Sequence, residues 1–327
     1  MKETAAQARL IMRRVALIYN PVSGQHSARR ATVIPDALAM LRSAGIQAEA
    51  IETDAPGSAG ARADEAMQRG CDTILACGGD GTVHEVLQRL VGTHVALGVV
   101  PMGTANALAQ DLGLGRSPLK AVRSLLAATP TQVPVGRIHY HDSSGAQCSR
   151  YFTVAAGIGA DALLMSRLDA GLKRRFGYVL YLVEAFRVWA TSSFPLFQAE
   201  LIESPGVPPR VEHVSQILAV RVRSFGGVLG RLAPGADLSK GTLRLLAFKT
   251  RSRFRYLSFL MAVLAGRHTF RKQVELLEAA SVRCSPLSGS SVPIFVEADG
   301  EVLGAMPVII EVAPQKLTLL VPHSARP

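Results

Sequence analysis

The 327-residue sequence has few cysteines, few aromatic residues and no long apolar run. Its four cysteines form no Cys-x-x-Cys pair, which excludes the zinc and redox sites built on that spacing. No stretch reaches the roughly 18 apolar residues that a membrane-spanning helix needs, because Glu184 and Arg187 interrupt the richest one, 176–197. Hydrophobic residues make up 48% of the chain and charged residues 19%, a balance that excludes a disordered protein.

What the chain has instead is positive charge. Lys and Arg number 36 against 25 Asp and Glu, which gives a formal charge of +11. This excess is typical of proteins that bind an anionic membrane, a nucleic acid or a small polyanion. Aromatic residues are only 6% of the sequence, and no helix-turn-helix or RNA-binding aromatic motif is visible, so we expect no nucleic acid partner. The first residues carry scattered charges and no signal-peptide pattern, which indicates a cytoplasmic protein.

Apolar runs and helical patterns divide the chain into two parts. Up to about residue 130, strands expected at 14–19, 47–53, 72–77 and 95–100 alternate with helical segments, which predicts a parallel sheet covered on both faces. Beyond the 129–134 segment the expected strands lie closer together, which predicts an antiparallel sandwich or barrel interrupted by helices near 173–191 and 253–266. The sequence therefore predicts an α/β domain over 1–130 and an antiparallel β domain over 131–327.

A glycine-bearing segment follows each of three expected strands in the first domain: Asn20–Gly24, Gly78–Thr82 and Pro101–Asn106. In a parallel sheet the carboxyl ends of all strands meet at one edge, where ligands bind. Glycines let the backbone approach a phosphate group closely, and the N-terminus of a following helix adds partial positive charge. Together the three segments predict a polyphosphate cradle that holds its ligand without the lysine of a Walker-type loop.

These motifs, NPVSG, GGDGTVHEV, PMGTANALA and a late Asp299-Gly300-Glu301, resemble those of the diacylglycerol kinase catalytic family, which includes sphingosine, ceramide and bacterial lipid kinases. The resemblance runs from about Val15 to Val321. It implies an N-terminal domain like that of phosphofructokinase and NAD kinase and a C-terminal β-sandwich. It also implies ATP and Mg²⁺ as cofactors and transfer of the γ-phosphoryl group to a lipid hydroxyl, diacylglycerol-like in the first place, within phospholipid biosynthesis.

The resemblance carries functional roles onto matching positions of this chain. The residues matched to ATP binding are Asn20, Pro21, Val22, Ser23, Gly24, Thr53, Gly78, Gly79, Asp80, Gly81, Thr82, Val83, His84 and Thr104. Glu301 matches the proton acceptor of the bacterial members, whereas Asp80 fits the pattern of the sphingosine kinases. We favour Glu301 as the base, with Asp80 organising the phosphates and the catalytic Mg²⁺, because a lipid hydroxyl needs a carboxylate to accept its proton.

Two positions depart from the bacterial pattern. Asn106-Ala107-Leu108-Ala109 stands where many bacterial members have Asn-Asp-Phe-Ala, and it is closer to sphingosine kinases, so a sphingosine- or ceramide-type substrate remains an alternative. Lys240 stands where bacterial relatives usually have an Asp that ligates a structural Mg²⁺. An ammonium group cannot ligate a cation. We therefore expect the structural Mg²⁺ site to be absent and Lys240 to supply the positive charge itself.

Basic residues precede two apolar helical stretches, at 173–175 before 176–189 and at 249–255 before 256–264. Such segments can bind an anionic leaflet, so we expect peripheral association with the inner face of the membrane; the alternative is that both helices pack on the sandwich. A soluble kinase of the NAD kinase type also remains open, because such enzymes share the Gly-Gly-Asp-Gly-Thr motif. The sequence gives no indication of the oligomeric state.

Overall fold

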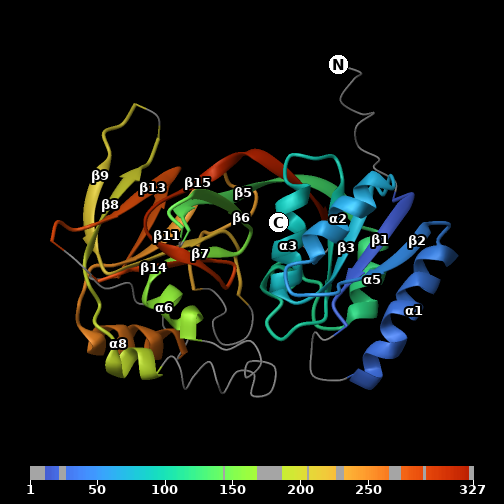
Figure 1. The fold of residues 1–327 in the computed structure, drawn as a ribbon, viewed down its shortest axis with the longest axis horizontal. Coiled ribbons are helices and arrows are strands. Elements are labelled where there is room, and N and C mark those ends of the chain that lie inside the picture. Colours follow the sequence, from blue (N-terminus) through green and yellow to red (C-terminus); the bar gives the residue numbers. More distant parts are fainter. Residues whose placement is uncertain are drawn as a thin grey trace. The chain divides into compact units, whose positions relative to one another are not determined.

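A computed structural model describes residues 12–21, 27–142, 144–167, 186–204, 206–225, 232–264, 274–289 and 292–323. By its internal contacts the chain divides into two compact units, which are drawn in Figure 1. Unit 1 comprises the residues up to Val133 together with those from Gln315, and unit 2 comprises Pro134–Pro314. The chain passes between the units twice, within strands β5 (Thr129–His141) and β15 (Glu301–Val321).

Unit 1 contains a parallel sheet in the order β15-β4-β3-β1-β2, to which β15 contributes its last residues. The bounds of the other four strands are β1 (Arg14–Tyr19), β2 (Gln47–Glu52), β3 (Thr73–Gly78) and β4 (Ala96–Pro101). Every residue of β3 and β4 is buried, which agrees with their continuous apolar sequences. The end of β15 joins this sheet because Leu319 pairs with Leu97, although we expected residues 131–327 to form the second domain.

Helices cover both faces of this sheet. The five helices of the described part of unit 1 are α1 (Ser27–Ser43), α2 (Ala59–Gln68), α3 (Asp80–Leu90), α4 (Ala107–Asp111) and α5 (Pro118–Leu126). Helix α2 packs beside α3, and α1 packs beside α5 on the other face (Figure 1). The alternation of strand and helix expected from the sequence is confirmed, and it places the loops after β1, β3 and β4 at one edge of the sheet.

Unit 2 is predominantly antiparallel. Its other strands are β6 (Gln147–Phe152), β7 (Ala155–Gly159), β8 (Phe197–Ile202), β9 (Arg210–Val214), β10 (Gln216–Val220), β11 (Leu243–Phe248), β12 (Val274–Ala279), β13 (Ser281–Pro286) and β14 (Phe295–Ala298). One path of pairing runs β12-β11-β10-β7-β14-β15, and a second runs β15-β13-β8-β9, with β5 and β6 paired to each other. Buried side chains from both paths, such as Ile158, Leu245, Leu201 and Val282, share one hydrophobic core. The antiparallel β-rich second half is therefore also as expected.

Helices interrupt unit 2 at three described places: α6 (Ala160–Arg167), a helical segment at 186–191, and α8 (Arg253–Leu264). Among the described residues, no helix is both long enough and apolar enough to cross a membrane.

Candidate functional site

The loops after β1 and β2 begin at the same edge of the unit 1 sheet. Tyr19, the last residue of β1, lies opposite Cys77 near the end of β3, and the backbone N–H of Thr53 donates to the carbonyl of Tyr19 at 2.9 Å. Asn20 therefore starts beside Thr53 on one side and beside the end of β3 on the other. Val22, Ser23 and Gly24 of the first loop lie outside the described residues.

The second and third glycine segments touch each other directly. A Cβ atom on Gly103 would lie 2.4 Å from the Cα of Gly79, and one on Gly79 would lie 3.4 Å from the Cα of Gly103. The N–H of Met102 also donates to the carbonyl of Gly78 at 2.9 Å. At position 103 only glycine permits this approach, so the two segments form one continuous surface of backbone.

Asp80 ties the same two segments together through its carboxylate. Oδ2 accepts the backbone N–H of Asn106 at 3.0 Å, and Oδ1 accepts that of Ala107 at 2.7 Å. Asn106 is left-handed, with φ 51°, and its side chain bonds the N–H and carbonyl of Gly103 at 3.0 and 2.8 Å. Asp80 thus caps the start of α4 from the start of α3, and this fixes the shape of the third loop.

The N-terminus of α3 has the geometry of an anion site. Gly79 is the residue before the helix, and because it has no side chain it leaves the first N–H groups of the helix accessible to a ligand. Gly78 is packed so closely that a Cβ there would lie 2.4 Å from Oγ1 of Thr82. Gly81 lies in the first turn and Thr104 is exposed on the third loop, whereas Thr82, Val83 and His84 are buried under them. In these two segments, the residues matched to ATP binding that can face a ligand are therefore Gly79, Asp80, Gly81 and Thr104.

Glu301 lies in unit 2, directly after a two-residue turn between β14 and β15. Asp299 and Gly300 form this turn with φ values of 49° and 85°. The carboxylate of Asp299 accepts the N–H groups of Thr153, Val154 and Ala155 at 2.9, 2.9 and 3.0 Å. These hydrogen bonds hold the turn against the start of β7. The backbone at Glu301, which follows the turn, is therefore held in a defined position.

Sequence reasoning missed a pair of carboxyl groups behind this turn. Glu297 on β14 is 3% exposed, and its side chain is hydrogen-bonded to Asp161 on α6. A Cβ on Gly157 would lie 2.7 Å from an oxygen of each side chain, so the pair occupies the space above a glycine. A signal was present in the sequence, since Glu297 is the one charged residue inside the apolar strand of Phe295–Ala298.

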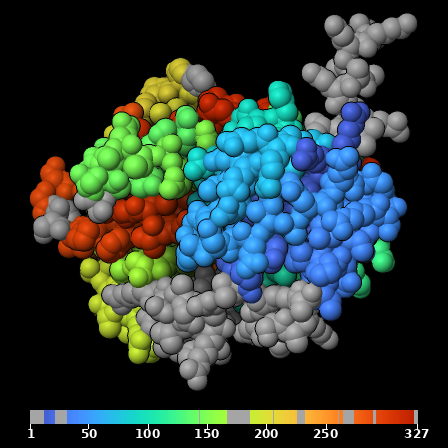
Figure 2. All heavy atoms as spheres, turned by 45° about the vertical axis from the view of Figure 1, so that its right-hand side comes forward, coloured from blue at the N-terminus to red at the C-terminus, as the bar shows by residue number. Residues whose placement is uncertain are grey.

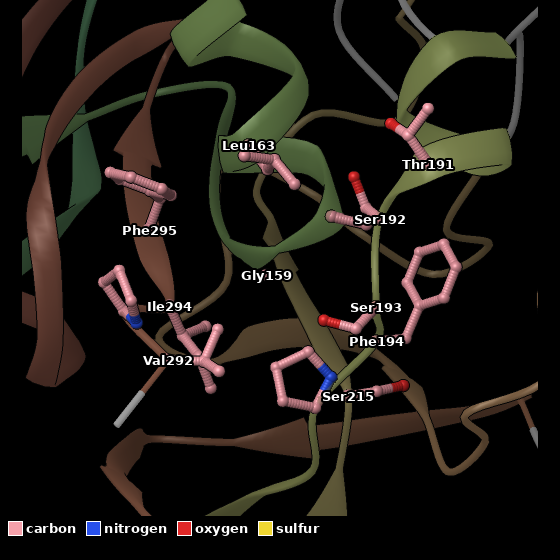
Figure 3. A pocket seen from close by; sticks show the side chains of 13 residues that line it. Gly159, Leu163, Thr191, Ser192, Ser193, Phe194, Ser215, Val292, Ile294 and Phe295 are labelled. Atoms are coloured by element: carbon pink, nitrogen blue, oxygen red, sulfur yellow. The ribbon is translucent and has the colours of Figure 1, made fainter. Parts of the chain in front are cut away.

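A pocket of about 270 Å³ lies in unit 2 at the other end of β14 (Figure 3). Leu163, Phe194, Val292, Ile294 and Phe295 provide apolar walls, while hydroxyl groups come from Thr191, Ser192, Ser193 and Ser215. The side-chain oxygen of Ser192 is buried and has no hydrogen-bond partner within the part of the chain that is described. A pocket with apolar walls and a few hydroxyls suits a ligand that is mostly apolar with a small polar group.

Aromatic stacking stiffens one wall of this pocket. Phe194 stacks on Tyr256 with centroids 4.3 Å apart, and Tyr256 stacks on Phe248 at 4.7 Å. The hydroxyl of Tyr256 lies 2.8 Å from that of Ser215, which also donates to the carbonyl of Thr250 at 2.5 Å.

Figure 2 shows α6 beside the segment that follows residue 186 at the surface of unit 2, and both contribute residues to the pocket.

An aromatic–basic patch lies on the helices next to the pocket. It consists of Phe186, Trp189, Phe254, Arg251, Arg253 and Arg255. Phe186 and Phe254 are 63% and 71% exposed, and Trp189 packs between them with centroids 5.3 and 6.2 Å away. Trp189 Nε1 donates to the carbonyl of Arg253 at 2.8 Å, which ties the 186–191 segment to α8. The basic residues 173–175 and most of the stretch that follows them lie outside the described residues.

A buried arginine lies against the 233–242 segment. Lys240 is exposed, whereas Arg221 is fully buried at 0% exposure. The Arg221 guanidinium donates to the carbonyls of Thr242, Pro134 and Leu238 at 2.7, 2.9 and 3.0 Å. Burial lowers the pKa of Arg221 to about 10, so it remains a cation at neutral pH. The Arg221 guanidinium therefore occupies these three carbonyl oxygens.

Two family models cover most of the chain. The model of the diacylglycerol kinase catalytic domain matches residues 14–138. The model of the YegS C-terminal NAD kinase beta sandwich-like domain matches residues 153–321.

Full-length relatives agree with these matches. A diacylglycerol kinase of Mycobacterium tuberculosis (strain CDC 1551 / Oshkosh) is 28% identical over 320 residues, which are 95% of this chain and 96% of the relative. The crystal structure of a diacylglycerol kinase from Bacillus anthracis str. Sterne has a TM-score of 0.68 at 18% identity and covers 97% of this chain and 100% of its own. Yeast NADH kinase complexed with NADH has a TM-score of 0.51 at 10% identity, covering 95% of this chain and 84% of its own. The expected likeness to the NAD kinase fold is confirmed.

Replacing Arg221 tests its role as an internal cation. We expect Arg221→Met to lower the free energy of unfolding by about 3 kcal/mol, because three buried carbonyls lose a charged donor. Lys240→Met, the matched control, should change it by no more than about 0.5 kcal/mol. Urea unfolding with and without EDTA measures both effects, and EDTA should not move the wild-type midpoint. A loss of stability in EDTA, or a larger effect at Lys240, would contradict this role.

Proposed function

Since the chain belongs to the diacylglycerol kinase catalytic-domain family, a family of lipid kinases, we propose that it is an ATP- and Mg²⁺-dependent kinase that phosphorylates the hydroxyl of a diacylglycerol-like lipid. The observation that carries this proposal is the contact of Gly79 with Gly103, braced by Asp80. It produces a backbone surface at a helix N-terminus, which is what a polyphosphate needs.

Unit 1 holds the nucleotide in this proposal. The N–H groups at the start of α3 and the hydroxyl of Thr104 bind phosphate oxygens, and Asn20 and Thr53 contact the nucleotide from the neighbouring strands. Bound Mg²⁺ neutralises the charge that develops on the transferred group. Asp80 keeps the second and third loops in register, and its carboxylate would also be the group of this cradle that holds a metal ion bound with the nucleotide.

Unit 2 holds the acceptor. The pocket between α6 and residues 191–195 combines apolar walls with a few hydroxyl groups, and this suits a glycerol ester better than a charged dinucleotide. Phe295 lines the pocket and Ala298 precedes the turn that leads to Glu301, so β14 spans about 10 Å between them. Glu301 accepts the proton of the lipid hydroxyl as the O–P bond forms.

The direct test is transfer of labelled phosphate from ATP to a panel of lipids in mixed micelles, with NAD in detergent-free buffer as the non-lipid acceptor. The proposal predicts a labelled product from diacylglycerol. Product from a sphingoid base or ceramide would instead support the alternative indicated by Asn106-Ala107-Leu108-Ala109. Transfer to NAD alone would contradict a lipid kinase.

Glu301→Gln tests the proton acceptor. We expect kcat to fall about 100-fold or more, because the amide cannot accept the hydroxyl proton, while the affinity for ATP is retained. Glu203→Gln, an exposed Glu of the same unit, is the matched control and should leave both parameters unchanged. Steady-state kinetics and calorimetric titration with ATP separate the two effects. A Glu301→Gln enzyme with wild-type kcat would show that Glu301 is not the base.

We further propose that the aromatic–basic patch binds the inner, anionic face of the membrane and brings the pocket to its substrate. Exposed aromatic rings beside three arginines match an interface where acyl chains meet anionic headgroups. Each arginine near such a surface contributes about 1 kcal/mol. The patch shares Arg251 and Arg253 with a second pocket of about 440 Å³ that also contains Ser192 and Phe194. The binding surface and the acceptor pocket are therefore neighbours on unit 2.

Flotation with lipid vesicles measures this attachment. Phe254→Ser and the pair Arg251→Gln/Arg255→Gln should each reduce binding to phosphatidylglycerol-containing vesicles about tenfold or more, because they remove exposed apolar area or two charges. Val211→Ser, which alters a similarly exposed apolar residue at 53% exposure, should have no effect. Equal binding by all variants would contradict the assignment of the membrane surface to this patch.

A further inference from the structure

The carboxyl pair Asp161–Glu297 lies between the acceptor pocket and the turn that carries Glu301. Glu297 is on β14, one residue before Ala298, and Asp161 is on α6, between the pocket residues Ala160 and Leu163. Gly157, which pairs with Glu297 across β7 and β14, leaves room for the two side chains to meet. A single cluster thus connects the wall of the pocket with the start of the turn.

Electrostatics require this pair to keep a proton. Burial raises the pKa of Glu297 well above its ordinary range, and the negative charges of Asp161 and Asp299 raise it further. Burial also raises the pKa of Asp161, while its hydrogen bond with Glu297 opposes that change. Two carboxylates in contact inside a protein cannot both ionise, so Glu297 holds the proton and donates it in a hydrogen bond to Asp161.

The second oxygen of Glu297 then acts on the turn itself. Oε2 accepts the N–H of Gly300 at 2.8 Å, while Asp299 is held by its three backbone donors and its own N–H donates to Ala155 at 2.8 Å. Both turn residues are left-handed, a conformation that costs energy at Asp299 because it is not glycine. The bond from Gly300 to Glu297 therefore holds the residue that directly precedes Glu301.

We propose that Asp161 and Glu297 are positioning residues that share one proton and, through the N–H of Gly300, fix the backbone from which Glu301 accepts the proton of the lipid hydroxyl. This rests on the function proposed above. The protonated pair makes three ordered contacts: Asp161 to Glu297, Glu297 to Gly300, and both side chains to the glycine surface at Gly157. An amide at position 297 can reproduce all three, whereas a methyl group reproduces none.

The test compares Glu297→Gln with Glu297→Ala, alone and combined with Glu301→Gln. We expect Glu297→Ala to lower kcat about 10- to 100-fold with the KM for ATP unchanged, because a displaced base costs rate and not nucleotide binding. Glu297→Gln should recover most of that loss, since its NH₂ group donates to Asp161 and its carbonyl oxygen accepts from Gly300. In the Glu301→Gln background, Glu297→Ala should cost little further rate, because the group that it positions is already gone.

Each outcome separates the positioning role from the base assignment. If Glu301→Gln is slow and the loss from Glu297→Ala is undiminished in that background, Glu297 acts independently of Glu301 and the positioning role is overturned while the proposed function stands. If Glu297→Gln is as slow as Glu297→Ala, the shared proton is overturned. If Glu301→Gln retains wild-type kcat, the base assignment fails and this inference fails with it. Circular dichroism melting shows whether each variant is folded at the assay temperature.

Discussion

The contact between Gly79 and Gly103 is the constraint on which the nucleotide half of the site depends. The two loops approach so closely that a Cβ atom on Gly103 would clash with Gly79, and Asp80 holds them together by accepting two N–H groups of the third loop. Strands β3 and β4 lie side by side because their apolar sequences are buried in a parallel pair. Both strands end at the same edge of the sheet, where the two loops begin. The cradle is therefore a product of sheet topology and of the absence of side chains.

Acidic side chains also accept backbone N–H groups in unit 2, where they hold the turn before Glu301. Asp299 accepts three backbone N–H groups and Glu297 accepts one, so carboxyl groups again hold a short turn in a shape that the backbone alone would not keep. Arg221 holds the backbone in the opposite sense, because its guanidinium donates hydrogen bonds to three carbonyl oxygens. In each case an ionisable side chain acts first as a partner for the backbone. Glu301 directly follows the turn that Asp299 and Glu297 hold.

Local pattern was sufficient to predict unit 1 and less so unit 2. The first strand was expected at Arg14–Tyr19 and found there, because a continuous apolar run bounded by charged and turn residues has few alternatives. In unit 2, the apolar pattern of 150–156 alone indicates one strand, but β6 ends at Phe152 and β7 begins at Ala155, since the Asp299 carboxylate accepts the N–H groups of Thr153 and Val154 between them. Arg221 and the Asp161–Glu297 pair escaped prediction for the same reason: their partners are distant in sequence and become visible only in the fold.

Calorimetric titration of ATP into Gly103→Ala tests the central claim most directly. Gly241→Ala is the matched control, because a Cβ atom there has no neighbour within 4 Å. If backbone contact between the second and third loops creates the phosphate site, Gly103→Ala should weaken ATP binding at least about tenfold while Gly241→Ala binds as the wild type does. Unchanged affinity in Gly103→Ala, with the protein folded, would contradict the account.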